Sequence, residues 1–365
     1  MKKKIKKIFP MMVMTIFGLI GGYWAGYIIA SKNVNVLETV FLFMSFPMFY
    51  IIHIVIHEAG HGLLGKISGY KMVSYRIFSF MWVWREDGTI HVRRYKVPGT
   101  LGQCLMAPPT YEAGKFPFRL YLLGGVIANI VTSLIVGAFF VPQSFLATSF
   151  AIVGILTALT NSIPIGFNDG MSLKIASSNE KQQYLLYLQF EINNQMNEGK
   201  TYAELPEQYF QLVSATSAHT YFNDWQQFLI IARLAEKHNW PLYQEQLEIL
   251  WQRKKEMISI YLLELKKEML FGLCLTAATD ERIPQIWTDK KIQAALKQPL
   301  MGNKRVKAAY VYCIEKDAQA ALELITAGKN LTHRAPNLGD AKTEGQLLVW
   351  LETKILNEES TPHNQ

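Results

Sequence analysis

The residues His57, Glu58 and His61 form the pattern H-E-x-x-H. On an α-helix, side chains four positions apart lie on one face, so the two imidazoles can hold one Zn²⁺ between them. Glu58 then stands where it can take and return protons at a water molecule that the ion activates. This spacing is typical of zinc hydrolases.

The motif lies inside an apolar run from Val40 to Leu64 in which, apart from the motif itself, only His53 can carry a charge near neutral pH. An acid at the centre of a membrane helix costs roughly 2.5–3.5 kcal/mol, so we expect these groups to serve a function. The simpler alternative is a helix with two hydrogen-bonded core histidines. His53 lies a further turn upstream, and we expect it behind the metal ligands or on the substrate side.

The excess of basic residues is confined to the first half of the chain. Residues 1–170 hold 15 Lys and Arg against 6 Asp and Glu, whereas residues 171–365 hold 22 against 23. Basic loops beside apolar segments indicate orientation in a membrane, and we expect no nucleic-acid partner. The three cysteines are scattered, which predicts neither a disulfide framework nor a cysteine-based zinc site.

Four apolar segments are long enough to cross a bilayer, at about 8–30, 40–65, 117–140 and 144–167. A basic head at 2–7 precedes the first. We expect this first segment to stay as a span and not to be removed as a signal peptide, because it is long and no small-residue cleavage site follows. The basic head and the basic loop 66–119 should both be cytoplasmic. The prediction is a multi-pass protein of the cell membrane with both termini in the cytoplasm.

Residues of about 72–97 predict a β-hairpin, because strand-favouring residues flank the turn dipeptide Asp87-Gly88. The strand before this turn is apolar on both faces. Two interpretations stay open: a small core hairpin, or a hairpin that dips into the membrane and offers an edge to an extended peptide.

The fourth span ends in NSIPIGFNDG, where Pro164 and Gly166 should break the helix. With four spans that start inside, the ends of the second and fourth fall on the same side of the membrane, so Asp169 can meet His57 and His61. Two imidazoles and one carboxylate leave a fourth zinc position open, as in catalytic sites. The alternative for Asp169, taken alone, is a turn or helix-end acid, since Asn-Asp-Gly favours a turn.

Residues 171–358 are polar with helical periodicity and predict an all-α cytoplasmic domain. Paired short helices near its end resemble helical-hairpin repeats of the tetratricopeptide kind, which bind protein partners. We expect the tail 359–365 to be disordered. The candidate helices are 178–198, 204–215, 221–238, 241–270, 303–315, 317–328 and 342–357. The predicted fold is thus an α-helical polytopic membrane protein with four transmembrane helices, a β-hairpin insertion and this C-terminal domain.

Together these motifs resemble the site-2 protease family of intramembrane zinc metalloproteases. The match comprises H-E-A-G-H at 57–61, N-x-x-P-x-x-x-x-D-G at 161–170 and G-x-x-x-N at 125–129, with the hairpin between the motif-bearing regions. It covers about residues 36–170, after a head and first span in 1–35. The chain departs from many members in having Ser162 in place of a second proline and no inserted PDZ domain.

The resemblance implies one Zn²⁺ per chain and cleavage of transmembrane or signal-peptide-like protein substrates near the cytoplasmic face of the lipid bilayer. It implies His57, His61 and Asp169 as metal ligands and Glu58 as general base and acid. It also implies that Asn129 and Asn161 position substrate or shape the site.

Two other classes of protein stay open. A non-catalytic membrane scaffold could keep the zinc site and bind partners through residues 171–358, although such a protein has no need of Glu58. A zinc-dependent transporter or a membrane lipid hydrolase fits less well, because the spacing of the D-G motif and the absence of further intramembrane acids disfavour it.

Overall fold

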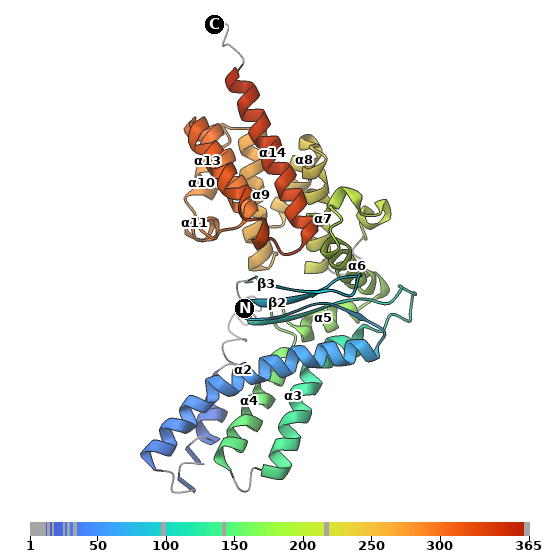
Figure 1. Cartoon of the computed structure of the whole chain (residues 1–365), viewed down its shortest axis with the longest axis vertical. Coiled ribbons are helices and arrows are strands. Elements are labelled where there is room, and N and C mark those ends of the chain that lie inside the picture. The colour runs from blue at the N-terminus through green and yellow to red at the C-terminus, as the bar shows by residue number, and fades with distance from the viewer. Residues whose placement is uncertain are drawn as a thin grey trace. The chain divides into compact units, whose positions relative to one another are not determined.

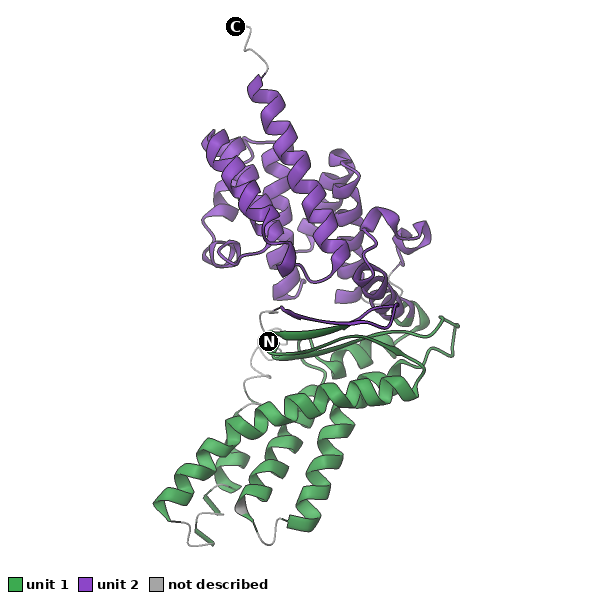
Figure 2. Ribbon diagram, in the orientation of Figure 1, with its two compact units in different colours: residues 1–83, 96–183 green, residues 84–95, 184–365 purple. Residues whose placement is uncertain are grey.

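The computed structural model describes residues 12, 15, 16, 18–24, 26, 27, 30, 31, 35–95, 100–140, 144–214 and 219–360. The chain forms two compact units (Figure 2). The first unit comprises residues 1–83 and 96–183, and the second comprises residues 84–95 and 184–365. The units are therefore interleaved along the sequence. The predicted basic head at 2–7 and the end of the predicted disordered tail lie outside the described residues.

Helices α2 (Val36–Ile67), α3 (Phe118–Phe140), α4 (Phe145–Ser162) and α5 (Asp169–Ala176) build the first unit together with a small sheet (Figure 1). The longest, α2, begins at a capping box. The Asn35 side chain accepts from the Glu38 backbone N–H, and the Glu38 carboxylate accepts from the Asn35 N–H. This reciprocal pair starts α2 a few residues earlier than the apolar pattern predicts. Helix α2 packs against both α3 and α4.

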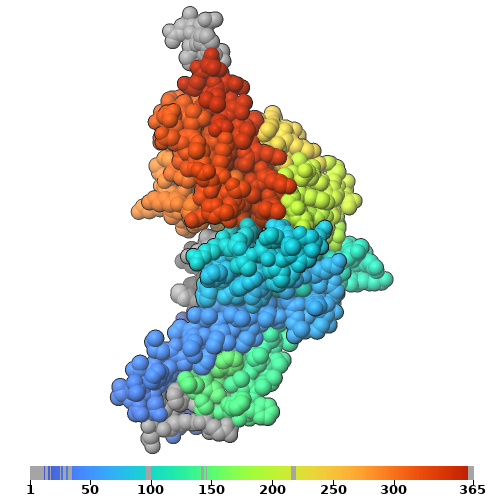
Figure 3. All heavy atoms as spheres, in the orientation of Figure 1, coloured from blue at the N-terminus to red at the C-terminus, as the bar shows by residue number. Residues whose placement is uncertain are grey.

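Two of these helices, α2 and α3, are long and apolar enough to cross a membrane, whereas α4 is apolar but shorter. Many large apolar side chains on α2 and α3 are exposed, among them Phe41, Phe43, Met44, Leu134 and Phe139. Part of the α2 surface is visible in Figure 3, where blue marks the N-terminal part of the chain. Apolar surface of this kind marks contact with a membrane or another protein. The first predicted span falls partly outside the described residues, and the four-span arrangement stays a prediction.

The sheet of the first unit contains β2 (Phe80–Trp84), β1 (Lys71–Ile77) and β4 (Gly102–Ala107), antiparallel and in that order, with β4 at an edge. The sequence predicts one long strand before Asp87-Gly88, and this is wrong. The chain reverses at Phe78-Ser79, so Ile77 pairs with Phe80. Phe78 adopts a positive φ of 53° there, a conformation that apolar patterning does not reveal.

The predicted turn at Asp87-Gly88 is confirmed. The Arg85 N–H donates to the Thr89 carbonyl at 3.0 Å, and Gly88 has a φ of 82°. The turn leads into β3 (Ile90–Arg94), which belongs to the second unit. Within that unit, Arg93 donates to the carbonyls of Ala335 and Pro336, so hydrogen bonds hold the 84–95 segment to residues far along the chain.

The second unit is mostly helical, and the helical prediction for this region is confirmed. Its buried core includes Leu247, Leu265, Met269, Ile325 and Leu351. Neighbouring helices such as α12 and α13 pack as hairpins. The elements are α6 (Glu180–Asn197), η1 (Tyr202–Glu204), η2 (Glu207–Phe210), α7 (Tyr221–Glu236), α8 (Trp240–Gln252), α9 (Ser259–Thr276), α10 (Arg282–Trp287), α11 (Lys290–Leu296), α12 (Met301–Tyr310), η3 (Val311–Glu315), α13 (Ala318–Lys329), η4 (Thr332–Arg334) and α14 (Leu338–Ser360).

Two of the predicted helices are wrong. The segment 241–270 is not one helix, because α8 ends at Gln252 and α9 starts at Ser259. The break is rich in charge, with Arg253, Lys254, Lys255 and Glu256, and offers little apolar surface to bury. In the segment predicted at 204–215, the described residues 204–214 contain only short 3₁₀ turns.

Helices α2 and α3 cross in close contact at Gly60 and Gly124. A Cβ atom at Gly60 would lie 2.4 Å from the Gly124 carbonyl oxygen and 2.5 Å from the Ala128 Cβ. Real side chains do not fit at such distances. The glycines beside the histidine motif thus allow the backbone of a neighbouring helix to approach.

Substitution of Gly60 by Ala should lower the free energy of unfolding by about 1–3 kcal/mol, because the added methyl group collides with backbone atoms. Denaturant unfolding of the purified chain in detergent would measure it. Ala59→Leu is the matched control, because Ala59 is the adjacent, exposed residue of the same helix. Equal stability of Gly60→Ala and wild type would contradict the close crossing.

Candidate metal centre

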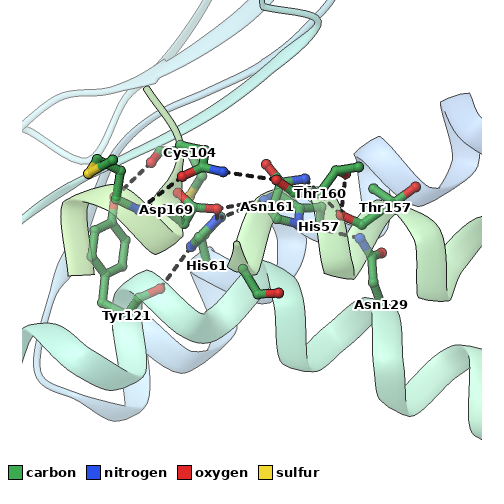
Figure 4. A network of polar contacts seen from close by, with 12 residues as sticks. His57, His61, Cys104, Tyr121, Asn129, Thr157, Thr160, Asn161 and Asp169 are labelled. Carbon is green, nitrogen blue, oxygen red and sulfur yellow. Dashed lines mark hydrogen bonds and ion pairs between the residues drawn. The ribbon is translucent and has the colours of Figure 1, made fainter. Parts of the chain in front are cut away.

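Three side chains from two helices converge on one point (Figure 4). His57 and His61 come from α2, and Asp169 is the first residue of α5. The Asp169 Oδ2 atom lies 3.0 Å from His57 Nε2 and 3.2 Å from His61 Nε2, and the two Nε2 atoms are 3.1 Å apart. The imidazoles are buried and the carboxylate is partly exposed. This group could hold a metal ion.

The donor atoms fit a metal ion in number, type and spacing. Ligands about 2.0–2.1 Å from a tetrahedral Zn²⁺ lie roughly 3.3 Å from one another, close to the separations of these three atoms. Two nitrogens and one oxygen leave a fourth position for water or substrate. Without a cation, two imidazole lone pairs would face a carboxylate at van der Waals distance or closer, which is favourable only if protons are taken up.

The tautomer of His61 follows from its backbone partner. His61 Nδ1 lies 2.8 Å from the carbonyl oxygen of Tyr121 on α3. A carbonyl can only accept, so Nδ1 carries the proton and Nε2 presents its lone pair to the centre. The Tyr121 hydroxyl in turn donates to the Cys104 carbonyl on β4 at 2.8 Å, which ties α3 to the sheet.

The tautomer of His57 follows from a longer chain of contacts. The side-chain amide of Asn129 on α3 lies 3.3 Å from His57 Nδ1 and 3.1 Å from His53 Nδ1, and His53 Nε2 lies 3.0 Å from the Phe150 carbonyl on α4. That carbonyl requires a proton on His53 Nε2, so a neutral His53 accepts at Nδ1.

A neutral His53 therefore takes an N–H from the Asn129 amide. The Asn129 oxygen then faces His57 and accepts from its Nδ1–H, which frees His57 Nε2 for a metal. In Figure 4 the amide nitrogen points to His57, and a half-turn of the amide exchanges the two atoms without moving its neighbours. His53 and Asn129 are fully buried, so both stand behind the ligands.

Asp169 is held by the turn that joins α4 to α5. Asn168 caps α5 by accepting from the Met171 N–H at 2.9 Å, and its amide donates to the carbonyls of Thr160 and Ile163. A Cβ at Gly170 would lie 2.1 Å from the Ser162 carbonyl oxygen, which explains the glycine after the acid. Burial opposes ionisation of Asp169, but the imidazoles of His61 and His57 outweigh it and hold the pKa of this carboxyl well below its usual range.

Glu58 lies beside the first residue of the edge strand β4. A Cβ at Gly102 would be 2.6 Å from Glu58 Oε1, so only glycine allows the strand this close to the carboxylate. Fully buried Arg76 fixes this end of the strand. Its guanidinium donates to the Gly102 carbonyl at 3.1 Å, the Phe78 carbonyl at 2.8 Å and the Thr100 hydroxyl at 2.5 Å.

The predicted site residues thus lie as follows. His57, His61 and Asp169 meet, and Asn129 contacts His57. The Asn161 amide donates to the Thr157 carbonyl of its own helix at 3.0 Å and not to a metal-ligand side chain. The substrate-positioning roles of Asn129 and Asn161 stay predictions.

Sequence reasoning misses the supports of the site: Arg76, Gly102, Tyr121, Phe150 and Asn168. A signal exists for Asn168, since an Asn before an apolar-periodic segment predicts a helix cap. The Tyr121 and Phe150 contacts use backbone carbonyls, which carry no signature in the sequence.

In comparison with known proteins, no family model, no curated protein and no solved structure matches this chain. The arrangement of the three ligand side chains is therefore established by the geometry of this molecule alone. It could hold a metal ion, and the identity of that ion belongs to the proposal below.

Purified protein should contain about one metal ion per chain, and His61→Ala should lose most of it because one of three protein ligands is gone. Elemental mass spectrometry measures both. His333→Ala, at an exposed histidine of the second unit, should keep the wild-type content. A wild-type metal content in the His61 variant would disprove the assigned ligand set.

Asn129→Leu should lower metal affinity about 10–100-fold, because His57 loses the partner that fixes its tautomer. His53→Phe should act in the same direction. The double variant should bind the metal no more weakly than the single variant with the lower affinity, because both substitutions break the same chain of contacts. Competition with a chelator measures affinity, and Thr132→Val, one turn from Asn129, is the control. Additive losses would mean that the two side chains act separately.

Proposed function

We propose that this chain is an intramembrane zinc metalloprotease that hydrolyses peptide bonds in transmembrane or signal-peptide-like segments. The observation that carries the proposal is the meeting of His57, His61 and Asp169 beside an intact Glu58. The resemblance of the H-E-x-x-H and D-G motifs to the site-2 protease family supports the same reading.

The donor set favours zinc over hard cations, since two imidazoles and one carboxylate suit Zn²⁺ better than Mg²⁺ or Ca²⁺. Bound there, Zn²⁺ would supply Lewis-acid activation of water and of the scissile carbonyl. Glu58 would take a proton from the attacking water on its carboxylate and deliver it to the leaving amine nitrogen. Burial of the two imidazoles keeps the ligands in place and limits the entry of solvent.

The edge strand β4 supports a peptide as the substrate. A peptide in a membrane helix protects its own carbonyls, so it must be extended before hydrolysis. An extended segment laid along the outer edge of β4 would be held by backbone hydrogen bonds that do not depend on its sequence. Its path would pass Gly102, the residue in closest approach to Glu58.

The membrane arrangement forms part of the proposal. Four spans with both termini in the cytoplasm would put the ends of the second and fourth spans, and hence His57, His61 and Asp169, near the cytoplasmic face. Polar groups at that depth could receive water from the cytoplasm. The exposed apolar surfaces of α2 and α3 agree with a lipid environment.

Glu58→Gln should reduce cleavage at least about 100-fold while the metal content stays at the wild-type level, because the amide cannot accept the proton. The readout is mass spectrometry of membrane-derived peptides from cells that carry either form of the protein. Glu38→Gln, on the same helix, is the matched control, since glutamine can still complete the capping box.

An unchanged peptide profile in the Glu58 variant would overturn the enzymatic proposal. Retained metal together with undisturbed biological function would instead favour a membrane scaffold that keeps the site for structure.

A further inference from the structure

Strands β1 and β4 both pack against α2. On β4, a Cβ atom at Gly102 would lie 2.6 Å from the Glu58 Oε1 atom and 2.8 Å from the Ile54 side chain. On β1, the Tyr75 hydroxyl donates to the Val55 carbonyl at 2.9 Å. This hydrogen bond therefore joins the sheet to the helix about one turn before Glu58, the proposed general base.

The order of residues round α2 shows where each strand lies relative to the metal centre. Helix residues three positions apart differ by about 60° around the axis, so Val55, Glu58 and His61 follow one another in that order. Strand β1 lies at Val55 and β4 lies at Glu58. The outer edge of β4 is consequently on the side of His61. Tyr75 lies one strand behind that edge, so an extended substrate bound there would be separated from Tyr75 by β4 itself.

Further along α2, the contact with the sheet is made by flexible sulfur-containing side chains. A Cβ atom at Gly62 would lie 3.0 Å from the Met72 Cε atom on β1 and 3.6 Å from the Cys104 Sγ atom on β4. A thioether adapts its shape to its surroundings, so such a contact fixes no precise distance. The hydrogen bond of Tyr75 is directional and does fix one.

Tyr75 is suited to this role because it keeps its proton. Burial raises the pKa of its phenol to about 12, and the Glu58 carboxylate and the Cys104 thiol add to the rise. The hydroxyl is thus a donor at neutral pH, and the Val55 carbonyl can only accept. The half-buried phenol ring lies beside Trp82 of β2, with the ring centroids 6.2 Å apart.

We propose that Tyr75 is a positioning residue of the site and that its hydrogen bond to Val55 sets the distance between β4 and Glu58. This inference rests on the proposed function. Backbone hydrogen bonds to β4 would hold the substrate, and the bond of Tyr75 would fix where the scissile carbonyl meets Glu58. A misplacement of about 1 Å can cost about 100-fold in rate, so a hydroxyl that does not touch the substrate can matter.

The test is Tyr75→Phe, which removes the hydroxyl and keeps the ring. With β-casein as the substrate and the full chain in detergent, kcat should fall about 10–100-fold. KM should stay within about twofold, because the strand edge that holds the substrate is intact. The metal content and the pH profile of kcat should match the wild type, since Tyr75 neither binds the metal nor transfers a proton.

Two further variants accompany this test. Tyr75→Met also lacks the hydroxyl and has an adaptable side chain, so it should reproduce the loss of kcat even if phenylalanine packs poorly. Tyr111→Phe is the matched control, because its hydroxyl donates to the Glu180 carbonyl at 3.4 Å and not to α2. It should cleave β-casein like the wild type.

Hydrogen exchange provides a readout that does not depend on cleavage. Loss of the hydrogen bond to Val55 should speed exchange of the amides of β1 and β4 about twofold to tenfold in Tyr75→Phe. Mass spectrometry of peptides that cover 71–77 and 102–107 measures it, and Tyr111→Phe should exchange there like the wild type.

An unchanged kcat in Tyr75→Phe, with Glu58→Gln inactive, would overturn the positioning role and leave the proposed function standing. Loss of one limb of the pH profile would also overturn it, because Tyr75 would then transfer a proton. Absence of any cleavage that depends on Glu58 would count against the proposed function instead. Unchanged hydrogen exchange in Tyr75→Phe would disprove the role of Tyr75 whether or not the chain cleaves β-casein.

Discussion

The candidate metal centre depends on the close crossing of α2 and α3. Where Gly60 meets Gly124, the two backbones approach to a distance that excludes any side chain. This contact brings the Tyr121 carbonyl and the Asn129 amide within hydrogen-bonding reach of His61 and His57. A wider crossing would leave both imidazoles free to rotate. The glycines in the motif therefore determine the chemistry of their neighbours through packing.

The same crossing has an electrostatic consequence. Two imidazoles and a carboxylate, gathered in a region with little access to water, are stable only with a cation or with added protons between them. The Tyr121 carbonyl selects the tautomer of neutral His61 that leaves its Nε2 atom unprotonated. The Phe150 carbonyl does the same for His57, acting through His53 and Asn129. With a proton on Nδ1 of each imidazole, both Nε2 lone pairs are directed at the position where a metal ion could bind.

The sequence predicts the ligands better than their supports. His57 and His61 follow from their helical spacing, and Asp169 follows from the order of the apolar segments. Both features can be seen in the types of the side chains along the sequence. The reversal at Phe78-Ser79 and the edge strand β4 escape prediction, since uniform apolarity hides a turn and Gly102–Ala107 lacks alternation. The break between α8 and α9 escapes for a related reason, because helical periodicity continues on both sides of it. The backbone partners of the histidines have no sequence signature at all.

The order of segments along the chain constrains how the molecule can be divided. Residues 84–95 lie between strands of the first unit yet belong to the second, where Arg85 and Arg93 donate to carbonyls near residues 197 and 335. The polypeptide consequently passes from one unit to the other three times. A truncation after residue 183 would remove the carbonyl acceptors of Arg85 and Arg93. An exchange of the C-terminal half between proteins would have to include the internal segment 84–95 as well. The helical second unit is thus not a C-terminal domain that can be removed without disrupting contacts of the segment 84–95.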